Sequence, residues 1–356
     1  MNIGGCSMTK HCVINYSIFF MLLSIIPGCT PQRPLVKRHL IAKKQENQIN
    51  SDLAYKKSSG RRAHTISKKT LRPRTYSPES SAITKNQEKL GHKPIITIWI
   101  HGTRIAPRYI LKNLLYSRPG IHPIKDFNKK YRLRSIADAL STADPELYPL
   151  EHIYQFGWSG NLCFLKREQE AELLYKDLLD LINQYKATYD TTPYIRIIGH
   201  SHGGNIALNL VPLIIKNNNI LTIDELILLA TPVQEKTAAY ITDPSIKKAY
   251  SLYSKADLIQ VIDPQKLYMK FSKHRHTYNF PKTASVFSHQ EFSPHKNLDQ
   301  IQIKLNGRAI LHNEFISSYF VKLLPQIIHE INLWHTEDDL EDAYNPNSIR
   351  ILKIRT

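Results

Sequence analysis

Ser201 lies in a segment whose residue types and spacing could support nucleophilic chemistry. Residues 194–204 read YIRIIGHSHGG, in which a β-like run is followed by the pattern G-x-S-x-G and then by a predicted helix. A serine in a sharp strand-to-helix turn has an exposed hydroxyl, and Gly199 and Gly203 remove side chains where that turn is tightest. We therefore interpret Ser201 as a candidate nucleophile; the alternative is a glycine-rich turn with an inactive serine.

The segment Trp99-Ile100-His101-Gly102-Thr103 ends the first predicted strand, about a hundred residues upstream. A glycine at this bend allows a backbone N–H to face a nucleophile, as an oxyanion hole requires. With these two motifs the chain resembles the α/β-hydrolase superfamily, in particular its lipase-like and esterase-like members, over residues 94–335. The resemblance implies that Ser201 is the nucleophile and that the backbone N–H groups of Thr103 and His202 are oxyanion donors. Only one glycine follows His101, so the multi-glycine form of this loop is absent.

The resemblance also implies a chain order of serine, acid and histidine. A serine needs a base, and the base needs an acid that fixes its tautomer. Asp257 is the preferred acid because it follows a predicted strand end, and Asp263 and Asp243 are alternatives. His312 is the preferred base because it follows the last predicted strand and opens an apolar segment. The alternative bases, His289 and His295, lie in an irregular segment.

Other reactive side chains are interpreted as structural. Cys163 lacks an elbow or helix-start context and is expected to be a small, buried or half-buried thiol. His101 and His200 flank the site, where packing or hydrogen bonding is the expected role, and Trp158 either lines the site or caps the core. The pair His274 and His276 lacks metal-ligand spacing, so we expect no metal and no cofactor.

The elements that must position these residues follow an α/β pattern. Short aliphatic runs alternate with helical patterns, which predicts one domain with a mostly parallel central sheet flanked by helices on both faces. The predicted strands are 95–100, 153–158, 194–198, 225–230, 250–254 and 300–305. The predicted helices are 165–185, 205–216 with a kink at Pro212, 313–328 and a short piece at 135–140. The connections 104–150 and 263–296 are otherwise irregular.

The N-terminal segment resembles a bacterial lipoprotein signal. The apolar run 18–26 is shorter than the ~20 residues that span a bilayer. It ends in Ile26-Pro27-Gly28-Cys29, which resembles a lipobox with Cys29 as the lipidated residue. The prediction is a signal peptide at 1–28, a flexible tether at 29–93, the hydrolase domain at 94–340 and a C-terminal tail at 341–356. An ordinary export signal with an incidental Cys29 is the alternative.

The positive charge is concentrated in the predicted tether. The 356-residue chain has a formal charge of +18, and residues 31–93 hold 16 Lys or Arg against 4 Asp or Glu, whereas residues 94–356 hold 31 against 26. A basic tether beside an anionic bilayer favours a membrane-surface partner. Nucleic-acid binding is not expected, because interleaved aromatics and a reader fold are missing. The four cysteines exclude a disulfide framework, since only Cys163 lies in the body.

Together these patterns predict a serine hydrolase, tethered to the bacterial cell envelope, that cleaves an ester, most plausibly of a lipid. Thr30 after Cys29 is compatible with sorting to the outer membrane. Acyl transfer or thioester cleavage would use the same machinery, because a fold does not fix a reaction. The alternative from another class is a catalytically silent lipoprotein that binds a partner through the same scaffold.

Overall fold

The structure is a computed structural model in which the described residues are 63–66, 93–103, 118–218, 220–265, 285–338 and 350–354. The chain divides into two compact units, Met1–Gly60 and Arg61–Thr356, and all described residues belong to the second. The predicted signal peptide 1–28, Cys29 and most of the predicted tether lie outside the described residues. Within the described part, no helix is both long enough and apolar enough to cross a bilayer.

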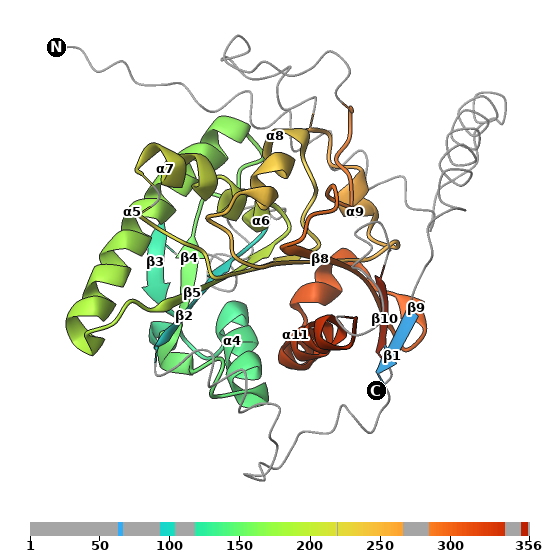
Figure 1. The fold of residues 1–356 in the computed structure, drawn as a ribbon, viewed down its shortest axis with the longest axis horizontal. Coiled ribbons are helices and arrows are strands. Elements are labelled where there is room, and N and C mark those ends of the chain that lie inside the picture. The colour runs from blue at the N-terminus through green and yellow to red at the C-terminus, as the bar shows by residue number, and fades with distance from the viewer. Residues whose placement is uncertain are drawn as a thin grey trace. The chain divides into compact units, whose positions relative to one another are not determined.

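A single twisted sheet forms the centre of the second unit (Figure 1). Its strands run in the order β1-β10-β8-β7-β6-β5-β2-β4-β3, with β9 paired to β8 outside this path. All pairs are parallel except β3 with β4 and β8 with β9. The bounds are β1 Ala63–Ile66, β2 Ile95–Ile100, β3 Gly120–Pro123, β4 Ile153–Gly157, β5 Tyr194–His200, β6 Glu225–Leu229, β7 Ala249–Tyr253, β8 Leu298–Leu305, β9 Arg308–Ala309 and β10 Arg350–Ile354.

Both faces of this sheet are covered by helices, as predicted. The larger helices are α4 Arg132–Ala143, α5 Phe164–Tyr189, α6 His202–Leu208, α7 Leu210–Lys216 and α11 Ser318–Asp338. The short elements are η2 Ile124–Asp126, η3 Leu150–His152, α8 Glu235–Ala238, η4 Ala239–Thr242, α9 Leu258–Val261 and η5 His312–Ile316. In Figure 1, α5, α6 and α7 lie on one side of the sheet, and α4 and α11 lie on the other.

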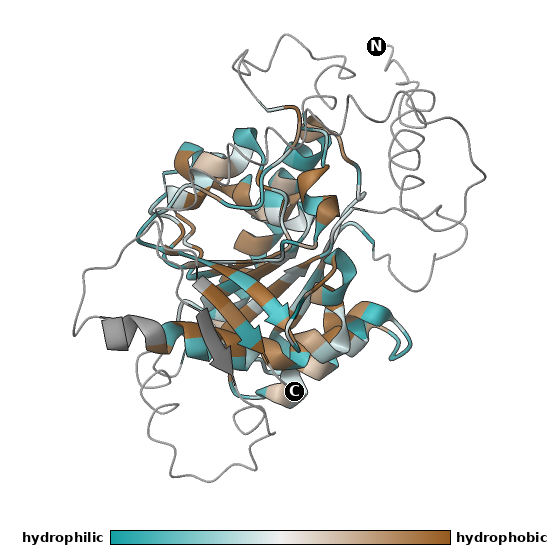
Figure 2. Cartoon of the chain, turned by 90° about the vertical axis from the view of Figure 1, so that its right-hand side faces the viewer, coloured by the Kyte–Doolittle hydropathy of each residue, from teal (hydrophilic) through white to brown (hydrophobic). Residues whose placement is uncertain are grey.

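The alternation of side chains along each strand explains the two layers. Successive residues of a strand point to opposite faces, so a strand covered on both sides is mostly apolar. Within β2, Ile98 packs in the core with α5 and α6, whereas Trp99 packs with α4 and α11. Figure 2 shows brown, hydrophobic segments along the strands of the sheet, with teal, hydrophilic segments between them. The six strands predicted from the sequence are all present for this reason, with ends that shift by at most two residues.

The predicted helices are present with changed boundaries. The helix predicted at 205–216 is divided into α6 and α7 at Asn209. Pro212 causes this break, because its ring clashes with the carbonyl four residues earlier, that of Leu208, and it has no N–H to bond there. The helix predicted at 313–328 begins only at Ser318, because residues 312–316 form the η5 turn. The Ser317 hydroxyl then accepts the Phe320 N–H at the helix start.

The sheet extends into segments that the sequence predicted as tether and tail. β10 pairs with β8 in parallel, and β1 pairs with β10. Leu352 and Ile354 of β10 are fully buried, so the strand belongs to the core. The five residues of β10, RILKI, give a weak signal, because two of them are charged and periodicity over so few residues does not distinguish a strand from a tail. The folded unit therefore includes residues on both sides of the predicted 94–340 boundary.

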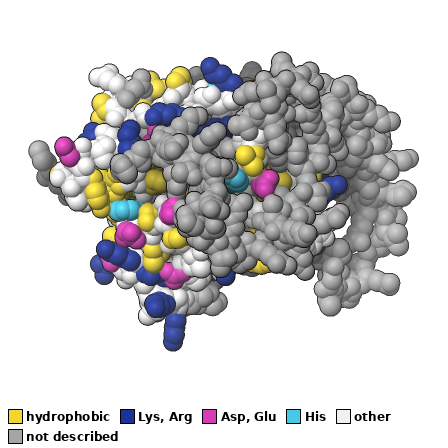
Figure 3. Space-filling model, turned by 60° about the horizontal axis from the view of Figure 1, so that its bottom comes forward, with side chains coloured by type: hydrophobic (Ala, Val, Ile, Leu, Met, Phe, Trp, Pro, Cys, Tyr) yellow, Lys and Arg dark blue, Asp and Glu magenta, His cyan; other side chains and the backbone are white. Residues whose placement is uncertain are grey.

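Charges of both signs mix on the surface of the folded unit. On the face seen in Figure 3, the Lys and Arg side chains of the described residues lie among Asp and Glu side chains. This mixing agrees with the near-balance of charges in residues 94–356 and contrasts with the basic predicted tether.

Candidate active site

Ser201 occupies a strained turn between β5 and α6. Its backbone has φ 52° and ψ −131°, which non-glycine residues rarely adopt. The turn is held because the Ser201 N–H donates to the carbonyl of Leu229 on β6, at 2.9 Å, and the Ser201 carbonyl accepts the Gly204 N–H at 3.0 Å. Strained residues persist only where the surrounding structure fixes them, and they cluster at functional sites. This is the elbow geometry that the sequence motif predicted.

Three glycines make the elbow sterically possible. A Cβ atom at Gly199 would lie 2.6 Å from the Cα of Gly204, and one at Gly203 would lie 2.6 Å from the carbonyl oxygen of His101. A Cβ at Gly204 would overlap the side chain of Thr231. Each of these distances is shorter than a non-bonded contact allows, so any other residue would push the elbow away from the neighbouring strands.

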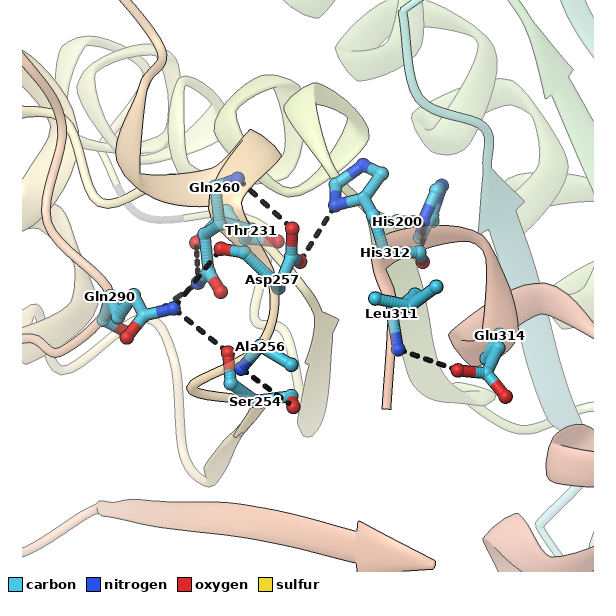
Figure 4. A network of polar contacts seen from close by, with 10 residues as sticks. All are labelled: His200, Thr231, Ser254, Ala256, Asp257, Gln260, Gln290, Leu311, His312 and Glu314. Carbon is cyan, nitrogen blue, oxygen red and sulfur yellow. Dashed lines mark hydrogen bonds and ion pairs between the residues drawn. The ribbon is translucent and has the colours of Figure 1, made fainter. Parts of the chain in front are cut away.

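The structure brings together the two other residues predicted for the site, Asp257 and His312. His312 Nδ1 lies 2.7 Å from Asp257 Oδ2, and both side chains are buried (Figure 4). A carboxylate only accepts hydrogen bonds, so Nδ1 carries the proton of the neutral ring and Nε2 is left as the acceptor. This is the tautomer that a general base requires when it takes a proton through Nε2.

The loop that carries Asp257 is fixed by its own polar contacts. Asp257 caps α9, because its Oδ1 accepts the Gln260 N–H at 3.1 Å. The Gln260 side chain donates to the Thr231 carbonyl, and the Gln290 side chain donates to the carbonyls of Ser254 and Asp257. These bonds, drawn in Figure 4, hold the carboxylate in place toward the histidine. The position of Asp257 just after β7 is the signal by which the sequence identified it.

His312 is tied to the elbow through His200, the residue before the nucleophile. His200 Nε2 lies 3.3 Å from the His312 carbonyl oxygen, and the two rings are 4.8 Å apart. Burial, reinforced by the nearby His312, lowers the pKa of His200 well below its usual 6.5, so its ring is neutral at neutral pH. Since a carbonyl only accepts, Nε2 carries the proton. His200 thus has the hydrogen-bonding role that the sequence analysis expected.

The loop after β2 lies against the nucleophile. A Cβ at Gly102 would be 2.8 Å from the Cβ of Ser201, so only glycine allows this approach. The indole Nε1 of Trp158 donates to the His101 carbonyl at 2.7 Å, and the two rings stack. Trp158 therefore anchors the loop, a role that the sequence analysis did not assign. Residues 104–117 lie outside the described part of the chain, and the role of Thr103 as an oxyanion donor stays a prediction.

These observations suffice to recognise the architecture: a mostly parallel sheet covered on both faces, with a strained serine turn after β5, an acid after β7 and a histidine after β8. The chain has the α/β-hydrolase fold.

Comparisons with known proteins find likenesses among solved structures. No protein-family model matches the chain, and no curated protein sequence matches it. Among solved structures, a hyperthermophilic esterase from Pyrobaculum calidifontis is 10% identical with a TM-score of 0.30, over 75% of this chain and 68% of that one. Carboxyl esterase 2 from Tuber melanosporum is 10% identical with a TM-score of 0.35, over 71% of this chain and 81% of that one. A putative hydrolase from Legionella pneumophila is 12% identical with a TM-score of 0.29, over 72% and 83%.

The residues predicted as alternative acids and bases have other partners in the structure. Asp263 lies 3.2 Å from His202 Nε2, and Asp243 accepts the Ser245 N–H in a turn. His289 pairs through its backbone with Val233, and His295 accepts the Asn297 N–H.

Cys163 and metal binding are the two remaining features for which the sequence analysis made a prediction. Cys163 is half-buried, as expected, but it directly precedes α5, which begins one residue before the helix predicted at 165–185, so the expectation that Cys163 lacks a helix-start context is wrong. Among the residues that the structure describes, no group of three or more His, Cys, Asp or Glu side chains is placed to hold a metal ion.

Proposed function

We propose that this protein is a serine hydrolase that cleaves carboxylic esters through an acyl-enzyme on Ser201. The observation that carries the proposal is the buried 2.7 Å contact between His312 and Asp257. His312 is joined through His200 to the strained turn that holds Ser201. A serine, an oriented imidazole and an orienting carboxylate are the parts that acyl transfer requires.

Each residue has one task in the proposed reaction. His312 Nε2 takes the proton of the Ser201 hydroxyl while Oγ attacks the carbonyl carbon of the ester. The negative charge that forms on the carbonyl oxygen is stabilised by the backbone N–H groups of His202 and Thr103. The protonated His312 then gives its proton to the leaving alkoxide, which departs as an alcohol. A water molecule, deprotonated by His312, releases the acid from Ser201 by the same steps. Asp257 keeps the His312 ring oriented throughout.

Exposed apolar side chains next in sequence to Asp257 and His312 support the proposal of an apolar ester. Leu258 directly follows Asp257 and is 66% exposed, and Leu311 directly precedes His312 and is 58% exposed. Large apolar side chains at such exposure gain about 25 cal/mol per Å² when an apolar group covers them. An ester with an alkyl chain, such as a lipid ester, would cover them, and a small polar ester would not. Thioester cleavage or acyl transfer to another alcohol would use the same residues.

A membrane tether through Cys29 is the second part of the proposal, and it stands on the sequence alone. Cleavage before Cys29 would leave 328 of the 356 residues, with a basic segment between the lipid and the folded unit. The test is metabolic labelling with a radiolabelled fatty acid in a bacterial host, comparing the wild type with Cys29→Ala. Label on the wild type alone supports a lipoprotein of the cell envelope; label on neither contradicts it.

A fluorophosphonate probe tests the catalytic part of the proposal, because it reacts only with an activated serine. The full-length protein is compared with Ser201→Ala and His312→Ala. Ser141→Ala in α4 and His329→Ala in α11 are matched controls far along the chain from the motif. Labelling that is lost in the first two variants and kept in the controls supports the proposal. A folded wild type that is not labelled and does not cleave p-nitrophenyl esters of two to twelve carbons favours the silent binding protein.

A further inference from the structure

A second buried histidine–carboxylate pair lies one residue from Ser201. His202 Nε2 is 3.2 Å from Asp263 Oδ1, and both side chains are at most 5% exposed. His202 belongs to the elbow itself, since it is the first residue of α6, whereas Asp263 follows α9 in the chain. The proposed reaction uses the Asp257–His312 pair and leaves this second pair without a task.

The Asp263 carboxylate is the centre of a buried polar chain. Its Oδ2 accepts hydrogen bonds from Gln234 Nε2 at 2.7 Å and from the Ser288 hydroxyl at 2.5 Å. The Gln234 side-chain oxygen in turn accepts from a guanidinium nitrogen of Arg167, at 2.8 Å. The Arg167 side chain on α5 is fully buried. These hydrogen bonds therefore connect four parts of the structure. Arg167 belongs to α5, and Gln234 follows β6. Asp263 and Ser288 lie on either side of residues 266–284, and His202 belongs to the elbow.

The charges of this chain set the state of His202. Burial lowers the pKa of His202, and Arg167 acts in the same direction, against the opposing effect of Asp263. The ring is then neutral at neutral pH, and its proton lies on Nε2, because only an N–H can donate to the Asp263 carboxylate. The Gln234 amide links the Arg167 cation to the Asp263 anion, so both buried charges have hydrogen-bonded partners.

We propose that Asp263 and His202 position the backbone N–H of His202 that serves as an oxyanion donor. This inference rests on the proposed function, in which that N–H stabilises the oxyanion. The N–H belongs to the peptide bond that joins Ser201 to His202, and the backbone of Ser201 is strained. On the other side of His202 stands Gly203, whose backbone is intrinsically permissive. Asp263 holds the side chain of His202. This contact restrains the orientation of the Ser201–His202 peptide plane and therefore the direction of the His202 N–H.

The same geometry separates the tasks of two neighbouring acids. Asp257 and Asp263 are six residues apart, and the sequence alone allows either to be the acid of the triad. In the structure, Asp257 contacts His312, whereas Asp263 contacts His202. Asp257 therefore acts on the base, and Asp263 acts on the geometry of the oxyanion donor.

The test compares an oxoester with the thionoester of the same acyl and alcohol groups, using the full-length protein. Sulfur accepts hydrogen bonds more weakly than oxygen, so a well-aimed donor favours the oxoester. We expect Asp263→Asn to lower kcat for the oxoester by about tenfold with KM little changed, and to lower the oxoester-to-thionoester ratio of kcat by a similar factor. The inflection of kcat/KM with pH stays where the wild type has it, because Asp257 still orients His312.

Asp257→Asn is the matched control, since it alters the other acid. We expect it to lower both rates together, to leave the oxoester-to-thionoester ratio unchanged and to alter the pH profile. His202→Phe and His202→Gln form a second pair that leaves the carboxylate with Gln234 and Ser288. The Gln variant keeps an N–H in the place of Nε2. Its oxoester-to-thionoester ratio of kcat is therefore expected to stay closer to the wild-type value than that of the Phe variant. This pair carries the test if Asp263→Asn does not fold.

An unchanged ratio in Asp263→Asn overturns the inference, whether both rates are kept or both fall together. If the wild type cleaves neither ester and reacts with no fluorophosphonate, the proposed function fails. The contact by which Asp263 holds the His202 ring is then tested by NMR. A slowly exchanging His202 Nε2–H that is present in the wild type and lost in Asp263→Asn supports the contact between His202 and Asp263. A His202 Nε2–H that exchanges fast in the wild type contradicts this contact.

Discussion

Replacing Gly203 with alanine tests whether the close approach of the elbow to the loop after β2 is required for activity. The new Cβ would lie 2.6 Å from the His101 carbonyl oxygen, and closer still to that of Ile100. Ordinary contact begins at 3.4 Å, so the chain must move by at least about 0.8 Å. Overpacking of this kind costs about 1–3 kcal/mol of unfolding free energy. A shift of about 1 Å at reacting groups lowers the rate by roughly a hundredfold.

The matched control is Gly307→Ala, in the turn between β8 and β9. Gly307 has φ +82° and no atom within 4 Å of a built Cβ, so alanine there suffers backbone strain alone, of about 1–2 kcal/mol. The two variants thus lose similar stability, measured by urea unfolding, but only Gly203→Ala loses activity, measured with p-nitrophenyl butyrate. A Gly203→Ala protein within about threefold of the wild-type kcat/KM refutes the argument that the elbow must sit against the strand.

Three further predictions follow from the geometry. Asp257→Asn lowers kcat by about 10³–10⁴-fold in the p-nitrophenyl ester assay, because His312 loses the carboxylate that fixes its tautomer; a wild-type rate contradicts the pairing. Since burial holds the folded-state pKa of His200 below its unfolded value near 6.5, the unfolded chain binds the extra proton as pH falls. Stability is therefore lost below pH 6.5 by up to ~1.4 kcal/mol per pH unit, and His200→Gln shows a shallower slope in urea unfolding from pH 7.5 to 5. Leu352→Ala lowers the unfolding free energy by about 2–5 kcal/mol; an unchanged urea midpoint contradicts the burial of β10.

The strands of the sheet centre and the chemistry at their ends could be read from the sequence. A strand buried on both faces is mostly apolar, so β2, β5 and β6 appear as short segments rich in Ile and Leu. The carboxyl ends of such strands meet at one edge of the sheet. Residues such as Asp257 and His312, which follow predicted strands, therefore converge although 55 residues separate them.

The remaining features depend on contacts that local patterns do not encode. The pairing of Asp263 with His202 is set by the packing of the loop after α9 against the elbow, and no spacing in the sequence indicates it. The anchoring of the loop after β2 by Trp158 depends on the neighbouring positions of β2 and β4. The start of α11 was placed too early because residues 313–316 are compatible with a helix, whereas the Ser317 cap and the η5 turn delay it.

The pairing of β1 with β10 has a consequence for how the chain is made. Residue 63 lies opposite residue 351, so the first described strand has no partner until almost the whole chain has been synthesised. At about 5–20 residues per second, the 284 residues from Ile66 to Arg350 take roughly 15–60 s to add. β8 itself is completed 45 residues before Arg350, and until β10 pairs with it β8 is an open sheet edge, which is a template for pairing with other chains. Residues 350–354 therefore cover the edge of β8, and chains that lack them are expected to aggregate before they lose the central sheet.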